Sequence, residues 1–598
     1  MKFRDFRARR ATKRPSRTSW IWSAPALVCL ALVMGPAPGE AVSDTFWGEY
    51  REMAVAADHP DASAAGYEIL AQGGNAADAA AATMLALGVA NPASSGMGGG
   101  GFLLYYRASD RSLTFLDFRE RAPAAATADM YADKPPPMEG PANAASQVGG
   151  LATGVPGEPA GVAEMVERFG SLPLNTIVGP AVRLAEGGVA VSPAVARMSS
   201  IFGGQMRRDA LMRGWFPSDE GGMPVGSELR QPELARTLRA FGRGGKRAIY
   251  SGAIARAIAS ANRRAGGVMT TADLRNYRVV EREPLRGSHF GFEWVTAPPP
   301  SAGGFTMLQS LAILEGIPER WRRIDEGPPS AAFLHALAES WKGPYLDRQR
   351  YFGDPDHVEL PLEAMMAPER LQARVDAFHP SLAMPPADFD LPLRPEDDVV
   401  QSDNAGTSHL CVVDREGNVA AVTTTVNLPF GARYTAAGMV MNDEMDDFAR
   451  AVGEANAFGL VGGAPNLPGP GKRPVSTMSP TIVIGQGGPA LCIGASGGSR
   501  IVTATQQVAM NQLLFGISPQ DALEGPRIHH QAAPNQLRTE EVSPLDADRL
   551  AALVARGHVH EPIHNVATVQ LIRIRGVGEA RRLIAASDPR KGGRPAGR

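Results

Sequence analysis

Cysteine is scarce in this chain, with three residues (Cys29, Cys411 and Cys492) in 598. So few cysteines exclude a dense disulfide framework and a four-cysteine zinc site. No CxxC or HExxH pattern occurs, and the adjacent His529 and His530 face different ways, which makes them a poor chelate. We therefore expect neither a metal nor an organic cofactor.

Net charge is also nearly absent. Lys and Arg number 60 against 62 Asp and Glu, for a formal charge of −2. This balance argues against nucleic acid or an anionic surface as the main partner. With 44% hydrophobic and 20% charged residues, the composition is that of a globular protein long enough for two to four domains.

The first 41 residues differ from the rest. Met1–Arg17 is rich in Lys and Arg, Trp20–Met34 is apolar, and residues 35–41 are mostly small. This order predicts a secretory signal peptide over residues 1–41 and a periplasmic or secreted protein. The apolar run is short for a membrane span of about 20 residues, although an uncleaved anchor is the alternative.

Removal of the signal would leave two cysteines, Cys411 and Cys492. Both lie in apolar segments typical of strands. We expect them to be buried free thiols, with a disulfide as the alternative in an oxidising compartment.

Apolar spacing predicts a helix over Asp61–Gln72 and a second over Ala76–Leu87, capped by Asn75. The glycine run Gly96–Gly101 then leads into a strand over Phe102–Arg107. No Gly-Lys-Ser/Thr follows this run, and a strand follows instead of a helix, so a phosphate-binding loop is disfavoured.

Residues 155–395 are predicted to be mostly helical, ending in a proline-rich and acidic surface segment over Pro385–Asp398. Beyond Thr407 the pattern changes to strands, followed by helices. The predicted elements are strands 410–413, 419–426, 480–484 and 490–493, and a helix over 501–514. Clustered strands with helices on either side predict an α+β fold, a four-layer αββα sandwich.

Thr407 follows Gly406 at the mouth of an apolar strand. Its hydroxyl could attack the Gly406 carbonyl in an N-to-O acyl shift, since glycine permits the strained geometry. Hydrolysis of the ester would leave Thr407 as a new N-terminus. One residue would then supply both a nucleophile and a base, because a free α-amine titrates near ~7.7–8.0.

Several further motifs surround this residue. They are Gln72–Ala80, Gly98–Phe102, Leu116–Glu120, Thr407–His409 with Val412–Asp414, Met445–Phe448, Lys472–Pro474, Met478–Thr481, Gly497–Arg500 and Ala586–Arg590. With these motifs the chain resembles the γ-glutamyltranspeptidase (glutathione hydrolase) family of N-terminal-nucleophile hydrolases. The resemblance covers roughly residues 50 to 590.

The resemblance implies a role for each matching residue. Thr407 would be the nucleophile, Thr425 would orient it, and the backbone N–H groups of Gly497 and Gly498 would form the oxyanion hole. The residues that would bind the γ-glutamyl head group are Arg119, Ser476 and Thr477 for its α-carboxylate and Asn427, Glu444 and Asp447 for its α-ammonium. Such a set suits a zwitterion, which needs a cation at one end and carboxylates at the other.

Four positions depart from the family pattern. Ser408 and Cys411 stand where threonine and serine are common, and both changes look tolerable. Thr477 replaces a serine and adds a methyl group that can crowd the acyl pocket. Phe458 stands where a lid tyrosine is often found, which would remove a hydroxyl contact.

The resulting hypothesis is a precursor cleaved between Gly406 and Thr407 into a large chain (42–406) and a small chain (407–598). The product would transfer γ-glutamyl groups from glutathione to water or to an amino acid or dipeptide through an ester on Thr407. Two alternatives remain: a glutaryl or cephalosporin-type acylase of the same fold, and an uncleaved binding protein without turnover.

Overall fold

The computed structural model describes residues 42–132, 145–325, 327–393, 406–452 and 463–598. Its centre is formed by two seven-stranded sheets. In order across the first sheet lie β21 (Ala596–Gly597), β2 (Ala54–Ala57), β10 (Gly406–Val413), β11 (Val419–Asn427), β3 (Gly100–Arg107), β4 (Ser112–Phe118) and β7 (Val280–Arg282). In order across the second lie β1 (Trp47–Tyr50), β20 (Arg582–Ser587), β19 (Thr568–Arg575), β15 (Gly488–Ser496), β14 (Thr481–Gly485), β9 (Phe292–Thr296) and β8 (Leu285–His289).

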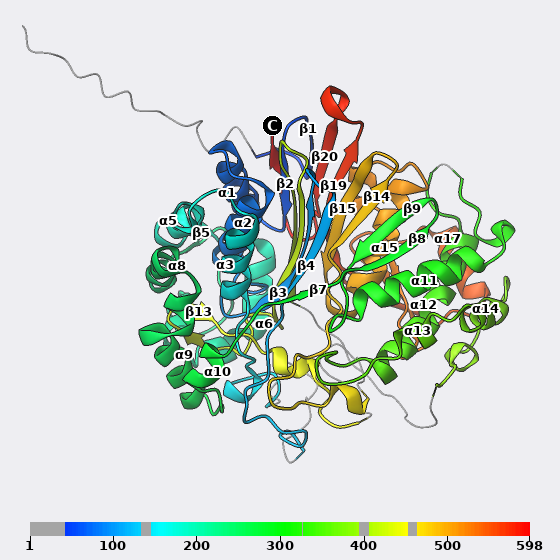
Figure 1. Cartoon of the computed structure of the whole chain (residues 1–598). Helices are drawn as coiled ribbons and strands as arrows, with labels where there is room; N and C mark the ends of the chain where they lie inside the picture. Colours follow the sequence, from blue (N-terminus) through cyan, green and yellow to red (C-terminus); the bar gives the residue numbers. More distant parts are fainter. Residues whose placement is uncertain (1–41, 133–144, 326, 394–405, 453–462) are drawn as a thin grey trace, which may run out of the picture. The chain divides into compact units, whose positions relative to one another are not determined.

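Helices cover the outer face of each sheet (Figure 1). Beside the first sheet lie α1 (Pro60–Ala71), α2 (Ala76–Ala90), α3 (Glu158–Phe169), α5 (Gly179–Gly187), α6 (Pro193–Met206), α8 (Pro232–Tyr250) and α9 (Gly252–Arg264). Beside the second lie α11 (Gly303–Gly316), α12 (Ala331–Tyr351), α14 (Pro368–Asp376), α15 (Ile501–Leu513) and α17 (Ala547–Ala555). This is the predicted αββα sandwich.

The sheets bury apolar side chains on both faces. Leu410 and Val412 of β10 join the core beneath the first helix layer, whereas Cys411 and Val413 face the core between the sheets. This alternation follows from the two-residue period of a strand. It explains why the predicted strand residues are apolar throughout.

The start of α2 and the glycine run Gly96–Gly101 can both be explained from their residues. The Asn75 side chain accepts hydrogen bonds from the N–H groups of Ala77 and Asp78, and Asp78 completes a capping box that starts α2. The glycine run packs tightly against its neighbours. A Cβ on Gly98 or Gly99 would lie 1.9 Å from a backbone oxygen, so the run serves close approach to β11 and the segment beside it.

The 155–395 region is mainly helical, as predicted, but it also supplies β7 to the edge of the first sheet, β8 to the edge of the second, and β9 beside β8. All three strands are short, and β7 and β8 carry polar residues on their exposed positions, so the sequence pattern did not reveal them. The end of the predicted segment Pro385–Asp398 and the predicted signal peptide lie outside the described residues.

The expectation of two free thiols is wrong. Cys411 on β10 and Cys492 on β15 form a disulfide, with their Cα atoms 6.0 Å apart. Both cysteines are fully buried in the core between the sheets. The two residues are 81 positions apart, and only the stacking of one sheet on the other brings them into bonding range.

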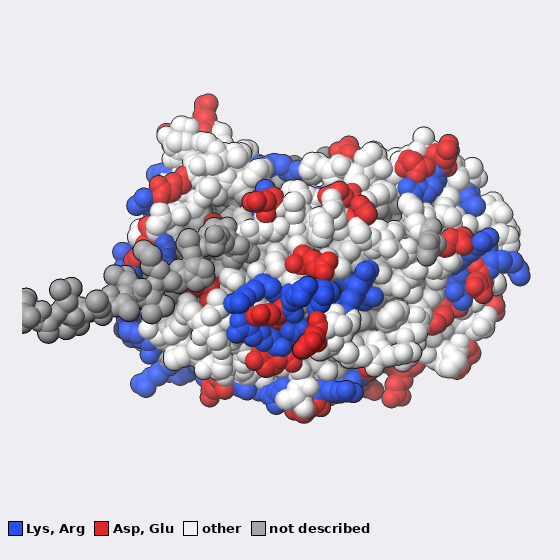
Figure 2. Space-filling model, turned by 90° about the horizontal axis from the view of Figure 1, so that it is seen from above, with Lys and Arg blue, Asp and Glu red and all other residues white. Residues whose placement is uncertain are grey.

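Within the described ranges, no helix is both long and apolar enough to cross a membrane. On the face shown in Figure 2, Lys and Arg side chains lie among Asp and Glu side chains rather than in a patch of one sign. This mixture agrees with the small net charge of the sequence.

Candidate active site

A small pocket contains nine of the ten predicted site residues. They are Arg119, Thr407, Thr425, Asn427, Glu444, Asp447, Ser476, Thr477 and Gly498, and they line the pocket together with Arg348, Met478 and Ile501. The tenth, Gly497, directly precedes Gly498. The structure therefore brings together residues that are up to 379 positions apart in the chain.

Thr407 lies at the start of β10 and pairs with Thr425 of the neighbouring strand β11. The two hydroxyl oxygens are 3.2 Å apart. The Thr425 hydroxyl donates to the carbonyl oxygen of Gly406 at 2.8 Å and accepts from the N–H of Asn427 at 2.8 Å. Thr425 thus contacts both the attacking hydroxyl and the carbonyl that it would attack.

The register of the ladder shifts at the Gly406–Thr407 peptide bond: Gly406 pairs with Asn427 and Thr407 with Thr425, so Val426 of β11 is skipped. On the opposite strand, Asn427 has a positive φ of 74°. Bulges and positive φ values of this kind interrupt a regular ladder and re-aim side chains. Both irregularities lie at the bond that the sequence analysis predicts to be cut.

The predicted oxyanion hole follows the end of β15. Gly497 and Gly498 have φ values of 150° and 59°, which favour glycine. A Cβ on Gly497 would lie 2.9 Å from the Cβ of Ala567. Thr477 donates its hydroxyl to the Gly498 carbonyl at 2.8 Å, so its side chain holds this turn in place.

Arg119 joins the acidic residues of the pocket directly. Its guanidinium is buried and donates to the carboxylates of Glu444 and Asp447. It also donates to the carbonyl oxygens of Pro474 and Val475, at 3.3 Å each. The residues expected to bind opposite ends of a zwitterion therefore pair with one another in this structure.

Burial controls the protonation of the acids here. Desolvation raises the pKa of Glu444 to about 7, and the Arg119 charge opposes that rise. Desolvation also raises the pKa of Glu120 and of Asp447. Glu120 lies beside Arg119, with 3.9 Å between its Oε2 and the Arg119 Nη1.

Sequence reasoning missed two cations near Thr407. Arg348 of α12 is buried in the pocket wall, where desolvation lowers its pKa to about 10 and the Asp447 charge opposes this effect. Lys591 donates from Nζ to the Thr407 carbonyl oxygen, to Asp58 at 2.7 Å and to the Ser496 hydroxyl at 3.0 Å. The signal for Lys591 was its place directly after the C-terminal motif Ala586–Arg590.

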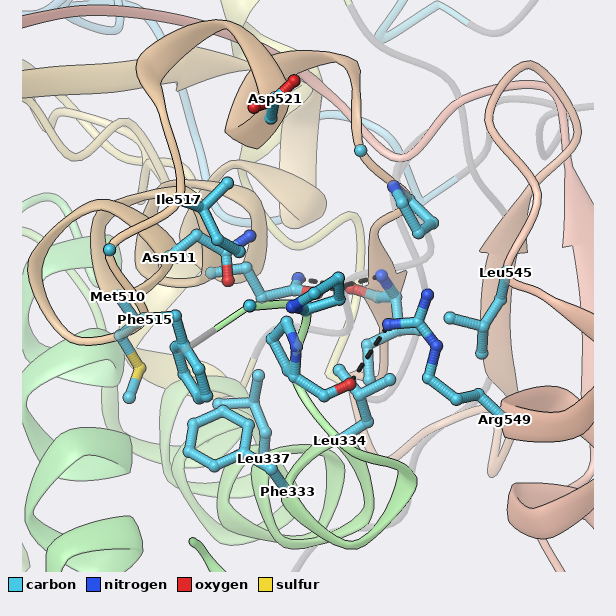
Figure 3. A pocket seen from close by; sticks show the side chains of 18 of the residues that line it. Phe333, Leu334, Leu337, Met510, Asn511, Phe515, Ile517, Asp521, Leu545 and Arg549 are labelled. Carbon is cyan, nitrogen blue, oxygen red and sulfur yellow. Dashed lines mark hydrogen bonds between the residues drawn. The ribbon is translucent and has the colours of Figure 1, made fainter. Parts of the chain in front are cut away.

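A larger cavity of about 650 Å³ lies elsewhere, between α12, α15 and the segment around Leu545. Figure 3 shows its wall, which includes Phe333, Leu334, Phe515 and Arg549. None of the ten predicted site residues lines it. Its size therefore does not make it the reaction centre.

One group among the described residues has the composition of a metal site: His335, Glu339 and His558. However, Glu339 already accepts from the Lys342 ammonium at 2.6 Å and from the Met384 N–H at 3.1 Å. His335 and His558 are 2.8 Å apart through ring nitrogens and satisfy each other. The atoms that could hold a metal are therefore already engaged in hydrogen bonds and an ion pair.

Comparison with known proteins agrees with the geometry of the site. The family model for gamma-glutamyltranspeptidase matches residues 62–598. The chain belongs to the gamma-glutamyltranspeptidase family. Members of this family are enzymes with the N-terminal-nucleophile hydrolase fold, and this chain is one of them.

Curated relatives span nearly the whole chain. It is 37% identical over 539 residues to the glutathione hydrolase proenzyme of Escherichia coli K12, covering 90% of each chain. It is 35% identical over 570 residues to glutathione hydrolase 2 of Arabidopsis thaliana, covering 91% of this chain and 93% of that one.

Solved structures share the fold. A cephalosporin acylase from Bacillus halodurans superposes with a TM-score of 0.77 at 25% identity, covering 95% of this chain and 99% of that one. The gamma-glutamyltranspeptidase of Helicobacter pylori gives a TM-score of 0.51 at 31% identity, covering 57% of this chain and 96% of that one.

Proposed function

We propose that this protein is a γ-glutamyl hydrolase and transferase that uses Thr407 as its nucleophile after cleavage at Gly406. The observation that carries the proposal is the position of Thr425. Its hydroxyl lies beside the Thr407 hydroxyl and donates to the Gly406 carbonyl. A carbonyl that accepts this bond is polarised toward attack.

Cleavage proceeds by an acyl shift. The Thr407 hydroxyl oxygen bonds to the Gly406 carbonyl carbon, the peptide C–N bond breaks, and the hydroxyl proton passes to the leaving nitrogen. Water then hydrolyses the ester, which frees the Gly406 carboxylate and the Thr407 hydroxyl. The products are a large chain of residues 42–406 and a small chain of residues 407–598.

Turnover repeats this chemistry on a substrate. The Thr407 hydroxyl attacks the γ-amide carbon while its α-amine takes the hydroxyl proton and passes it to the leaving amine. The backbone N–H groups of Gly497 and Gly498 bind the oxyanion. Water or an amino-acid amine then takes the γ-glutamyl group from the Thr407 ester.

The binding residues favour a donor with an amino-acid head group. Arg119 matches an α-carboxylate, and Glu444 with Asp447 matches an α-ammonium, with Asn427 beside them. A zwitterion would exchange the Arg119–Glu444 and Arg119–Asp447 pairs for contacts of its own charges. Ser476 and Thr477 add hydroxyl groups at the same wall. Glutathione, the substrate after which the relatives are named, is the proposed donor.

The N-terminal segment supports export. We propose that residues 1–41 are a signal peptide and that the enzyme works in the periplasm or outside the cell. The basic, apolar and small-residue order of this segment supports that placement.

Three measurements test the proposal together. A denaturing gel of the purified protein should show two bands, and N-terminal sequencing of the smaller should begin Thr-Ser-His-Leu. γ-Glutamyl-p-nitroanilide should be hydrolysed. A single full-length band without hydrolysis would contradict the proposal and favour a binding protein.

The acylase alternative rests on the fold shared with the Bacillus halodurans cephalosporin acylase. A glutaryl group lacks the α-ammonium, which would leave Glu444 and Asp447 without a ligand charge. The matched comparison is glutaryl-p-nitroanilide. Faster hydrolysis of the glutaryl compound would decide for the acylase.

A further inference from the structure

Three contacts cross between the sheets in a row from β10 to β15. At one end is the disulfide between Cys411 and Cys492. In the middle the His409 ring lies against Gly494, where an added Cβ would be 2.3 Å from a ring carbon. At the other end Lys591 bridges the Thr407 carbonyl oxygen and the Ser496 hydroxyl.

The row has the spacing of strand side chains. Residues 407, 409 and 411 occupy one face of β10, and residues 492, 494 and 496 occupy one face of β15. The two strands belong to different sheets, so no backbone ladder fixes one against the other. Their relative position depends on side-chain contacts in the core between the sheets, and these three contacts are among them.

Both strands end in the reaction centre. Thr407 is the second residue of β10, four residues before Cys411, and Gly497 follows the last residue of β15, five residues after Cys492. The distance from nucleophile to oxyanion hole is therefore a distance between the two sheets. A misplacement of about 1 Å can reduce a rate by ~10²-fold.

We propose that the Cys411–Cys492 disulfide is a positioning cross-link for γ-glutamyl transfer, fixing the strand that carries Thr407 against the strand that leads to Gly497 and Gly498. This proposal rests on the proposed function. It assigns a specific task to Cys411, which stands where serine is common in the family. It also gives the enzyme a covalent element that the other two contacts of the row lack.

The middle contact shows why the disulfide is suited to this task. His409 is fully buried, and desolvation lowers its pKa to about 3, so its ring is neutral and contributes no ion pair across the interface. Its Nδ1 is 2.9 Å from the Thr423 hydroxyl, which lies within its own sheet. The contact between His409 and Gly494 thus keeps the two strands from moving closer together, but it does not keep them from moving apart.

The first measurement is the state of the two sulfurs. Peptide mapping of the purified, unreduced enzyme by mass spectrometry should find the Cys411 and Cys492 peptides joined, and reduction should separate them. Recovery of both as free thiols would overturn the proposal whether or not the enzyme hydrolyses γ-glutamyl substrates.

The second measurement is kinetic. The variants Cys411→Ser and Cys492→Ser, and their double variant, should lower kcat for γ-glutamyl-p-nitroanilide by on the order of tenfold. KM should stay within about twofold, because the head-group residues Arg119, Glu444 and Asp447 lie on neither strand. The single and double variants should agree, since each removes the same bond.

Loss of stability alone is separated by a control. Leu583→Ala removes a buried side chain from β20 in the same core and should lower the unfolding temperature without changing kcat. All assays are made on folded, fully cut protein well below the unfolding temperature. Unchanged kcat in the cysteine variants, or an equal loss in Leu583→Ala, would refute a positioning role. An inactive wild-type enzyme with an intact disulfide would instead refute the proposed function.

Discussion

The Thr425 hydroxyl donates a hydrogen bond of 2.8 Å to the carbonyl oxygen of Gly406. A threonine on β11 thereby contacts the peptide bond at the start of the neighbouring strand β10. We therefore expect Thr425 to act in chain cleavage as well as in turnover.

Replacing Thr425 by valine keeps the shape of the side chain and removes the hydroxyl. We expect cleavage to slow by on the order of 10²-fold, the usual loss when one oxyanion donor is removed. Uncut precursor should accumulate on a time course of denaturing gels. Thr425→Ser should restore most of the rate, and equal rates in Thr425→Val and wild type would rule out this role.

Replacing Arg119 by lysine keeps the charge and removes the planar fork. Charge-assisted hydrogen bonds contribute about 1.5–3 kcal/mol each, so KM for the γ-glutamyl donor should rise roughly 10- to 100-fold. Arg121→Lys is the matched control, because Arg121 donates to the Gly471 carbonyl and does not line the pocket. A similar rise in KM for both variants would show that Arg119 has no specific part in binding.

Binding of the product L-glutamate should depend on pH through Glu444. Burial raises the pKa of this carboxyl from 4.5 to about 7, so the ligand's α-ammonium meets an ionised partner only above that value. The dissociation constant, measured by calorimetry, should fall as pH rises through about 7. Glutarate, which lacks the ammonium, is the control ligand and should not gain affinity over this range.

The contribution of Glu444 to folding stability should depend on pH in the opposite direction to its contribution to L-glutamate binding. A carboxyl whose pKa is raised in the folded state contributes stability that is complete below its unfolded pKa, near 4.5, and is lost as pH rises through about 7. Glu444→Gln should remove both trends. Retention of the pH-dependent L-glutamate affinity in Glu444→Gln would assign the titration to another group.

Thr477 departs from the family pattern by one methyl group. Its hydroxyl donates to the Gly498 carbonyl, so Thr477→Ser keeps this bond and should retain kcat within about threefold. Thr477→Val loses the bond and leaves a buried carbonyl without this partner, and kcat should fall about tenfold. Equal activity in the two variants would show that the hydroxyl does not hold the turn.

The sequence could predict those site residues that lie within recognisable motifs. Thr407, Arg119 and Gly498 belong to short patterns whose chemistry is readable, and strand and helix periods indicated the layers. The predicted lid residue Phe458 lies outside the described part of the chain.

The missed features depend on stacking one sheet upon another. The disulfide joins strands 81 residues apart, and the Lys591 contact with Thr407 spans 184 residues. In the sequence nothing distinguishes Arg348 from an exposed arginine on a helix. Its burial follows from the packing of α12 against the second sheet. Periodicity reports which face of a strand is buried but not which residue it meets.

The order of strands has a consequence for how the cut enzyme can be recovered. In the first sheet β2, from before the cleavage site, lies between β21 and β10, which both come from after it except for Gly406, the first residue of β10. Cleavage therefore yields two polypeptides that share one sheet rather than two folding units. Refolding of the denatured, cut enzyme therefore requires the bimolecular association of the two chains. Its rate should depend on protein concentration, whereas the uncut Thr407→Ala precursor should refold at a rate independent of it.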